Sequence, residues 1–303
     1  MATRIQKELM KKQWTVREAG RNVSVFKIDL KHVGDEQWVL LQSDVHWDNP
    51  KCDRELLTKH LDLALERNAP VIDAGDWFCA MQGKYDKRSS KKDIRPEHNS
   101  DNYLDLLKRT SVDFLEPYKD IITVRGYGNH ESAIKKNHET CLTAEMVAIA
   151  KDRGFPHISK GGFSGYVKFQ VITGGKAAAF KLWYFHGAGG GGPVTRGVIQ
   201  TNRQAVYVSD ADFVFTGHTH DSFQLPISRI RLNSADRIEH CRQTHIKAGG
   251  YKEEFLDGNG GWHVERGGPP KPVGAYWIRF HYPKGTTNGQ EHRTAEYDLI
   301  EAK

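Results

Sequence analysis

Apolar positions in the first two thirds of the chain alternate between the spacing of strands and that of helices. Apolar runs of strand length occupy 38–45, 71–74 and 121–124, and each ends in a polar cluster. Between the first two, Leu57, Leu61 and Ala64 recur at helical spacing within 54–67, and Pro70 prevents that helix from continuing. Further helices are expected over 102–118, 143–151 and, at the N-terminus, 3–18. This alternation predicts an α/β fold.

From residue 165 onward the pattern becomes that of strands. Residues 167–172 and 181–185 are expected to pair through a turn at Gly174 and Gly175. A short strand is expected at 212–215, and alternating segments such as 276–281 follow. No stretch has the composition of a linker, so we expect one domain over 1–303, with an N-terminal extension at 1–36 and a β-rich C-terminal part at 222–303.

The composition is that of a soluble globular protein, with 38% hydrophobic and 27% charged residues. No apolar stretch approaches the roughly 20 residues that span a bilayer, and no apolar segment of a signal peptide follows the basic start. The cysteines are far apart and form no CxxC pair, which disfavours a disulfide framework and a structural zinc knuckle: Cys52, Cys79, Cys141 and Cys241. We therefore expect a cytoplasmic protein with no membrane partner.

Polar clusters rich in aspartate, asparagine and histidine follow the predicted strands. In chain order they are Asp44-Val45-His46, Gly75-Asp76, Gly128-Asn129-His130-Glu131, His186-Gly187 and Gly217-His218-Thr219-His220. Oxygen and imidazole donors suit Mn, Fe, Zn, Ni or Mg rather than copper(I). In an extended segment, residues two apart point to the same side. Asp44 with His46, and His218 with His220, would then each present two ligands in one direction.

These clusters resemble the calcineurin-like metallophosphoesterase superfamily, whose motifs DxH, GD, GNH[DE], H and GHxH occur here in that order. Each motif alone is weak evidence, whereas the ordered set is specific. The resemblance implies a two-layered α/β sandwich with mixed sheets facing each other and helices outside. It also implies two divalent metal ions, with manganese favoured and Fe, Zn, Ni or Mg as alternatives.

Carried over residue by residue, the resemblance implies that Asp76 bridges the two metals. The first metal would be held by Asp44, His46, Asp76 and His220, and the second by Asp76, Asn129, His186 and His218. His130 would protonate the leaving oxygen during hydrolysis of a phosphoester by a metal-activated hydroxide. Taken singly, any of the 15 histidines is more simply an ordinary polar residue. The complete ordered set argues against that alternative and against a member of the fold that has lost catalysis.

The loop after Asp76 suggests a polyanionic substrate. It is strongly basic between Lys84 and Arg95, and Arg88 is the preferred phosphate contact because its planar fork can hold two oxygens. Arg196, in the glycine-rich segment after His186, is a second candidate. With a net charge of +6, these features favour a phosphodiester, DNA or RNA among them. A phosphomonoesterase or cyclic-nucleotide phosphodiesterase, and a non-catalytic nucleic-acid-binding subunit, remain as alternatives; the sequence does not indicate the oligomeric state.

The second motif separates the chain from related subfamilies. Here it reads GDWFCAM, so Cys79 stands where the similar Ser/Thr protein phosphatases have the aspartate that orients the acid. Position 79 is likewise not the tyrosine of purple acid phosphatases. Asp76-Trp77-Phe78 is compatible with the GDxF of nucleases of the Mre11/SbcD group, although Cys79 does not match there either. The carboxylate that orients His130 is therefore open, with Asp86 as a candidate.

Four aromatic residues, Trp47, Trp77, Tyr251 and Trp262, could stack on bases of a nucleotide chain, but burial is the commoner explanation.

Overall fold

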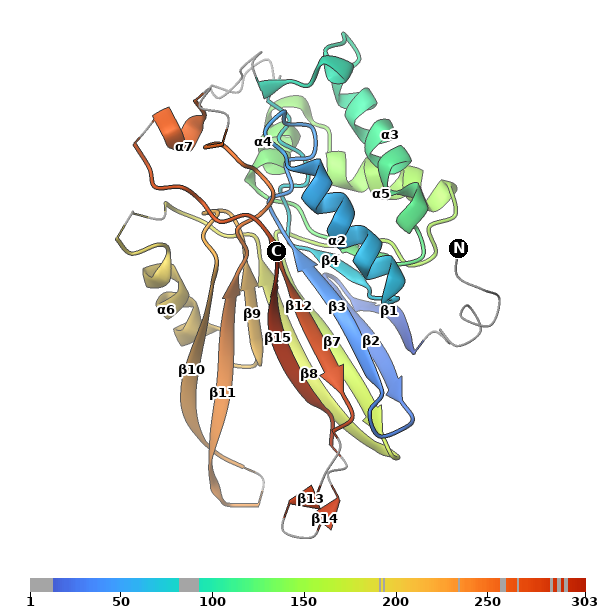
Figure 1. The fold of residues 1–303 in the computed structure, drawn as a ribbon, viewed down its shortest axis with the longest axis vertical. Helices are drawn as coiled ribbons and strands as arrows, with labels where there is room; N and C mark the ends of the chain where they lie inside the picture. Colours follow the sequence, from blue (N-terminus) through green and yellow to red (C-terminus); the bar gives the residue numbers. More distant parts are fainter. Residues whose placement is uncertain are drawn as a thin grey trace.

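The computed structural model consists of two mixed β-sheets that face each other, with helices on the outside (Figure 1). It describes residues 13–81, 93–190, 192, 194–233, 235–256, 260–265, 267–283, 286–287, 290–291 and 294–303. This architecture confirms the α/β sandwich expected from the sequence. Within the described ranges, none of the helices combines the length and the hydropathy needed to cross a bilayer.

The larger sheet has seven strands in the order β1-β2-β7-β8-β9-β11-β10. Their bounds are β1 Trp14–Gly20, β2 Val23–Leu30, β7 Ser164–Thr173, β8 Lys176–Phe185, β9 Phe213–Thr216, β10 Phe223–Leu232 and β11 Ile238–Lys247. The expected hairpin is confirmed as β7 and β8, joined through Gly174 and Gly175. Along β7, buried and partly buried residues alternate, as in a strand with one face on a core.

The smaller sheet has six strands in the order β15-β12-β3-β4-β5-β6. Their bounds are β3 Glu36–Gln42, β4 Val71–Asp73, β5 Ile122–Arg125, β6 Ser159–Lys160, β12 Ala275–His281 and β15 Glu296–Ala302. Strands β3, β4, β5 and β6 are parallel to one another, and β4 and β5 are buried throughout. A separate short hairpin consists of β13 Thr286–Thr287 and β14 Gln290–Glu291.

Three helices cover the outer face of the smaller sheet: α2 Arg54–Glu66, α3 Tyr103–Leu115 and α5 Leu142–Asp152 (Figure 1). Helix α2 begins after Asp53, whose side chain accepts a hydrogen bond from the backbone N–H of Leu56, and it buries Leu57, Leu61 and Ala64 as expected. The remaining helices are α4 Asn129–His138, α6 Val198–Tyr207 and α7 Trp262–Glu265, with 3₁₀ turns η2 Pro96–His98 and η3 Glu116–Tyr118.

The helix expected over 3–18 is wrong for its described part. Residues from Trp14 onward form β1, which pairs antiparallel with β2, and residues 1–12 lie outside the described residues. Pairing with β2 and burial of Trp14 against Phe26 outweigh the local helical pattern. Part of the expected N-terminal extension therefore lies within the larger sheet rather than beside the sandwich.

The core between the two sheets is rich in aromatic side chains. Phe280 of the smaller sheet is fully buried, and its ring lies 5.0 Å from that of Phe169 and 5.2 Å from that of Phe180, both in the larger sheet (centroid distances). These contacts join the two layers.

Replacement of Phe280 by alanine should lower the free energy of unfolding by about 3–5 kcal/mol, because it removes the contacts between the sheets and leaves a cavity. Urea denaturation of the chelated protein measures this loss. Val33→Ala is the control, since Val33 is 52% exposed and its loss should stay within about 0.5 kcal/mol. Equal losses in the two variants would contradict the role of Phe280 in joining the layers.

Candidate metal centre

The five polar clusters follow strands that run parallel to one another within each sheet. From the smaller sheet, Asp44 and His46 follow β3, Asp76 follows β4, and Asn129 and His130 open α4 after β5. From the larger sheet, His186 follows β8, and His218 and His220 follow β9. The seven predicted ligands thus come from loops of both layers.

The donor atoms of these residues gather in two groups. In each group the donors lie within 4.8 Å of one another; the first contains Asp44, His46 and His220, and the second Asp76, His186 and His218. In the first group the two imidazole Nε2 atoms are 3.4 Å apart. In the second, Oδ1 of Asn129 lies 3.1 Å from Nε2 of His186, which places the seventh predicted ligand beside it.

Each aspartate uses one oxygen to accept a backbone amide and directs the other toward imidazole nitrogens. Oδ2 of Asp44 accepts from the N–H of His218 at 2.8 Å, and its Oδ1 is 3.5 Å from Nε2 of His220. Oδ1 of Asp76 accepts from the N–H of His130 at 2.9 Å, and its Oδ2 is 3.1 Å from Nε2 of His186. The hydrogen bond from the N–H of His218 to Asp44 also links a loop of the larger sheet to a loop of the smaller sheet.

Burial controls the charges of the first group. Loss of hydration raises the pKa of Asp44 to about 7 and lowers the pKa of His46 and of His220 well below the usual range. Among the described residues, Oδ1 of Asp44 has no hydrogen-bond partner although it is buried. A buried carboxylate oxygen lacking a hydrogen-bond partner, beside neutral imidazoles, fits a divalent cation, which would offset the cost of desolvation.

The expected extended geometry of the ligand pairs is wrong. Asp44, His46, His218 and His220 all have positive φ angles, between 49° and 72°, and so does Asp76 at 53°. Left-handed residues other than glycine cost of the order of 1–3 kcal/mol each and persist where the surroundings hold them, often at functional sites. Asp44 and His46 nevertheless lie in one group, whereas His218 and His220 lie in different groups, as the residue-by-residue assignment predicted.

Two glycines, Gly128 and Gly217, lack the Cβ atoms that would fill the space occupied by the carboxylates of Asp76 and Asp44. A Cβ atom on Gly128 would collide with Oδ1 of Asp76, and one on Gly217 would collide with Oδ2 of Asp44. The glycines of the GNH and GHxH motifs are therefore required by the close approach of backbone to ligand.

Glu131, the last residue of the GNHE motif, is buried and holds the loop that carries Asp76. Its carboxylate accepts the backbone N–H of Asp76 at 3.2 Å, of Phe78 at 2.9 Å and of Gly128 at 2.8 Å. From the sequence, no role was assigned to Glu131. Its place beside Asn129 in the motif is a signal that could have indicated one.

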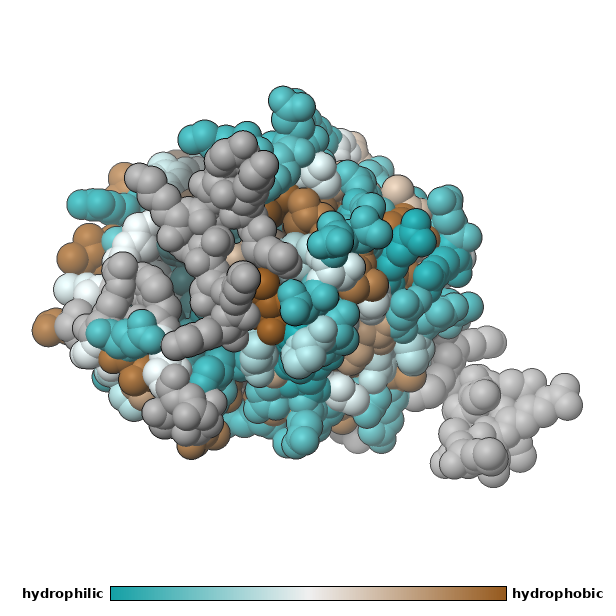
Figure 2. Space-filling model, turned by 90° about the horizontal axis from the view of Figure 1, so that it is seen from above, coloured by the Kyte–Doolittle hydropathy of each residue, from teal (hydrophilic) through white to brown (hydrophobic). Residues whose placement is uncertain are grey.

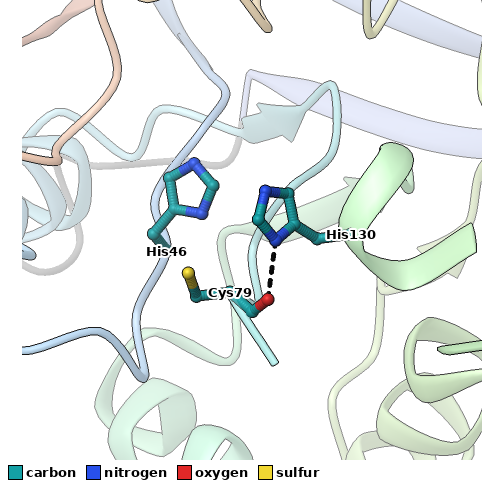
Figure 3. Close-up of side chains that lie close together, drawn as sticks. All are labelled: His46, Cys79 and His130. Atoms are coloured by element: carbon teal, nitrogen blue, oxygen red, sulfur yellow. Dashed lines mark hydrogen bonds between the residues drawn. The ribbon is translucent and has the colours of Figure 1, made fainter. Parts of the chain in front are cut away.

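Among the described residues, the backbone carbonyl of Cys79 contacts His130 and orients its ring. Its Nδ1 lies 2.6 Å from the carbonyl oxygen of Cys79 (Figure 3). Asp48 in turn fixes this peptide segment, since its carboxylate accepts from the N–H of Cys79 at 2.6 Å and of Ala80 at 2.8 Å. The same carboxylate accepts from the hydroxyl of Tyr103 at 3.0 Å. The alternative candidate, Asp86, lies outside the described residues.

Further charged residues that the sequence did not single out surround the first group. Nζ of the buried Lys247 donates to the carbonyl of Gly217 at 3.3 Å. The carboxylate of Glu254 accepts from Nδ1 of His263 at 2.9 Å, and Nζ of Lys252 lies 2.5 Å from its other oxygen. The ring of His263 is 5.3 Å from that of His220.

The predicted substrate contacts are not brought to the metal centre by any described interaction. Arg88 lies outside the described residues. Arg196 is exposed in the turn before α6, with a φ of 45°. Arg95, at the end of the basic segment, donates to the carbonyl oxygens of Asn49 and Cys52 at 3.0 and 3.1 Å, so it stabilises a turn.

The aromatic residues considered for base stacking are buried where their side chains are described. Trp47 and Trp77 stack on each other at 6.5 Å, and Nε1 of Trp77 donates to the hydroxyl of Ser111. Tyr251 is fully buried, with its hydroxyl 2.9 Å from Nδ1 of His60. The side chain of Trp262 lies outside the described part.

No family model matches the sequence, and no curated protein matches it. Among solved structures, a conserved uncharacterised protein of Streptococcus pneumoniae, described as a predicted phosphoesterase, aligns over 88% of this chain and 98% of its own, with 10% identity and a TM-score of 0.31. Vps29 of Entamoeba histolytica, complexed with Zn²⁺, aligns over 88% of this chain and 100% of its own, with 11% identity and a TM-score of 0.31. At these values the alignments carry no argument about what this chain binds or catalyses.

Replacement of Asp48 by alanine should lower the free energy of unfolding by about 2–4 kcal/mol, because two buried backbone N–H groups and the hydroxyl of Tyr103 lose their acceptor. Urea denaturation of chelated protein measures the loss. Asp101→Ala is the matched control, since Asp101 is exposed and its removal should cost under about 0.5 kcal/mol. A loss for Asp48→Ala as small as for the control would show that Asp48 does not hold the loop.

Proposed function

We propose that this chain is a phosphoesterase of the calcineurin-like type that works with two divalent metal ions. The observation that carries the proposal is the gathering of oxygen and imidazole donors from four loops into two largely buried groups, with Asn129 beside the second. Structural ion pairs rarely place so many imidazoles against carboxylates, whereas a metal centre requires that arrangement.

The donors would be divided between two cations. Asp44, His46 and His220 would hold the first, and His186, His218 and Asn129 the second, with Asp76 between them. The donor set accepts manganese, which we place first, as well as Fe, Zn, Ni or Mg. When bound, two such cations would lower the pKa of water and neutralise charge on a phosphate.

His130 is proposed as the residue that protonates the leaving oxygen. A carbonyl oxygen can only accept a hydrogen bond, so the carbonyl of Cys79 keeps the proton on Nδ1. The proton that moves is then the one on Nε2. The side chain of His130 is 16% exposed, against 2% for Asp76, so it is the more accessible of the two to a substrate. After transfer, the neutral imidazole remains held by the same hydrogen bond.

For the substrate we favour a phosphodiester, DNA or RNA among the candidates, on the basis of the net charge of +6 and the basic segment after Asp76. The buried positions of Trp47, Trp77 and Tyr251 give no support to base stacking. A small-molecule phosphomonoesterase or cyclic-nucleotide phosphodiesterase is the alternative enzyme. A nucleic-acid-binding subunit without activity is the alternative outside enzymes.

Metal-dependent hydrolysis of bis-p-nitrophenyl phosphate tests the proposal. After chelation, added Mn²⁺ or Ni²⁺ should restore activity to the wild type and not to His218→Ala, because that variant lacks a ligand of the second cation. His240→Ala is the matched control, since His240 is exposed on β11 and should leave activity unchanged. Two bound metals without cleavage of any phosphoester would favour the binding subunit. A chain that binds no metal would overturn the proposal.

A comparison of substrates separates the two enzymatic alternatives. Cleavage of bis-p-nitrophenyl phosphate without cleavage of p-nitrophenyl phosphate indicates a phosphodiesterase, and the reverse indicates a phosphomonoesterase. Single-stranded DNA and RNA, tested with the same Mn²⁺-loaded protein, then show whether a polynucleotide is cleaved.

His130→Ala should retain both metals but lower turnover by about 10²–10⁴-fold for a substrate with a poor leaving group, because protonation of the leaving oxygen is lost. For p-nitrophenolate, which leaves without much protonation, the loss should be smaller. Rates for an alkyl and a p-nitrophenyl ester, together with metal content, measure the difference. Equal losses for both esters would exclude His130 as the proton donor.

A further inference from the structure

A third group of potential ligands shares His46 with the first and, among the three groups found in the described residues, is the one that contains a cysteine: His46, Cys79 and His130 (Figure 3). Donor atoms of the three side chains lie within 4.8 Å of one another. His46 and Cys79 are buried, and His130 is partly buried. The group draws on the loops after β3 and β4 and on the first turn of α4.

The two nitrogens of His46 face different surroundings. Nε2 faces His220 in the first group, at 3.4 Å from Nε2 of that residue. Nδ1 is buried and has no hydrogen-bond partner among the described residues. In Figure 3 the ring nitrogen nearer to the sulfur of Cys79 is this second one, adjacent to the carbon that joins the ring to the chain. A buried nitrogen without a partner therefore points into the third group.

His130 and Cys79 complete the arrangement. Because Nδ1 of His130 is engaged by the carbonyl of Cys79, Nε2 is the nitrogen that can serve as a ligand, and in Figure 3 it lies on the side of the ring that faces His46. The rings of His46 and His130 are 4.9 Å apart at an angle of 74°. Cys79 is a free cysteine whose sulfur accepts from the side-chain amide of Asn49 at 3.2 Å.

We propose that Nδ1 of His46, Sγ of Cys79 and Nε2 of His130 form an inhibitory site for a thiophilic divalent cation, Zn²⁺ or Cd²⁺. One thiolate and two imidazoles form the donor set of a tetrahedral zinc site with one open position. Manganese and magnesium prefer oxygen ligands, so softer cations would bind such a site more strongly than they do. On binding, the thiol of Cys79 loses its proton to solvent and the sulfur forms the bond to the cation. Where Nε2 of His46 already holds a cation in the first group, Nδ1 of the same ring would also release its proton to solvent, and its lone pair would form the second bond.

The inhibitory effect rests on the proposed function, whereas the binding does not. A cation on Nε2 of His130 would occupy the nitrogen that is proposed to protonate the leaving oxygen. His46 also belongs to the first group of ligands, so the same cation would be connected to that group through the His46 ring. Zinc or cadmium in excess should therefore stop turnover in a protein that already carries manganese.

Titration of the Mn²⁺-loaded full chain with Cd²⁺ tests the site. The readout is the ultraviolet charge-transfer absorption of a cadmium–thiolate bond, which the two sulfur-free groups cannot produce. Cys141 and Cys241 are replaced by serine in every protein, because they are partly exposed and would bind cadmium on their own. In this background the band should saturate at one Cd²⁺ per chain.

Two variants separate Cys79 from the other buried thiol. Cys79→Ser should lose the band, and Cys52→Ser, the matched control with a buried free cysteine, should keep it. His130→Ala keeps the thiol, and its affinity for Cd²⁺ should fall at least about tenfold through loss of a ligand. Circular dichroism verifies that each variant is folded. A band that persists in Cys79→Ser, or that is absent from the parent protein, would overturn the site.

Activity measured in the same titration tests the inhibition. Each protein is compared with its own rate before Cd²⁺ is added, and Cys79→Ser should need at least about tenfold more Cd²⁺ for half inhibition. If the band forms and activity is unaffected, the site binds the cation but does not inhibit. If neither the parent protein nor any variant hydrolyses a phosphoester, the proposed function is wrong. The absorption band still shows whether the site exists.

Discussion

The arrangement of the loops that carry the candidate ligands depends on the carboxylates of Asp44 and Asp76. Both are buried, and removal of a charged carboxylate from water is expensive unless other groups compensate it. Each obtains part of that compensation from one backbone N–H, that of His218 for Asp44 and that of His130 for Asp76. The second oxygen of each faces imidazole nitrogens. Beside Asp44, burial lowers the pKa of His46 and of His220, so these two rings supply no positive charge. A divalent cation is the partner that satisfies both the carboxylates and the imidazoles.

The backbone around these carboxylates is held by other buried carboxylates. Glu131 accepts N–H groups from the segment that carries Asp76, and Asp48 accepts those of Cys79 and Ala80. Such bonds oppose the cost of the left-handed conformations at the candidate ligands. The fold thus uses two kinds of acidic residue at this end. One kind belongs to the candidate metal centre, and the other fixes the loops that position it.

Cys79 connects the proposed chemistry with its proposed inhibition. Its carbonyl contacts His130, and its sulfur lies beside the same imidazole. In Ser/Thr protein phosphatases, from which the second motif of this sequence departs, an aspartate orients the acid. An aspartate at this position would present a second carboxylate to the ligands. The cysteine replaces that charge with a neutral thiol, since burial raises the pKa of Cys79. It also introduces a soft donor where the neighbouring ligands are oxygen and nitrogen.

The sequence by itself determined the α/β alternation, helix α2, the hairpin of β7 and β8, and the identity of the candidate ligands. These features depend on local spacing and on ordered motifs, which a single sequence displays. Only the tertiary structure decided that residues from Trp14 onward form a strand, because pairing with β2 supplies the stabilisation. It also decided that the backbone of His218 and His220 is left-handed rather than extended, because this conformation depends on how the loops pack after folding. The sequence also could not predict the roles of Asp48, Glu131 and the carbonyl of Cys79. Each of them acts through backbone groups that lie together only after folding.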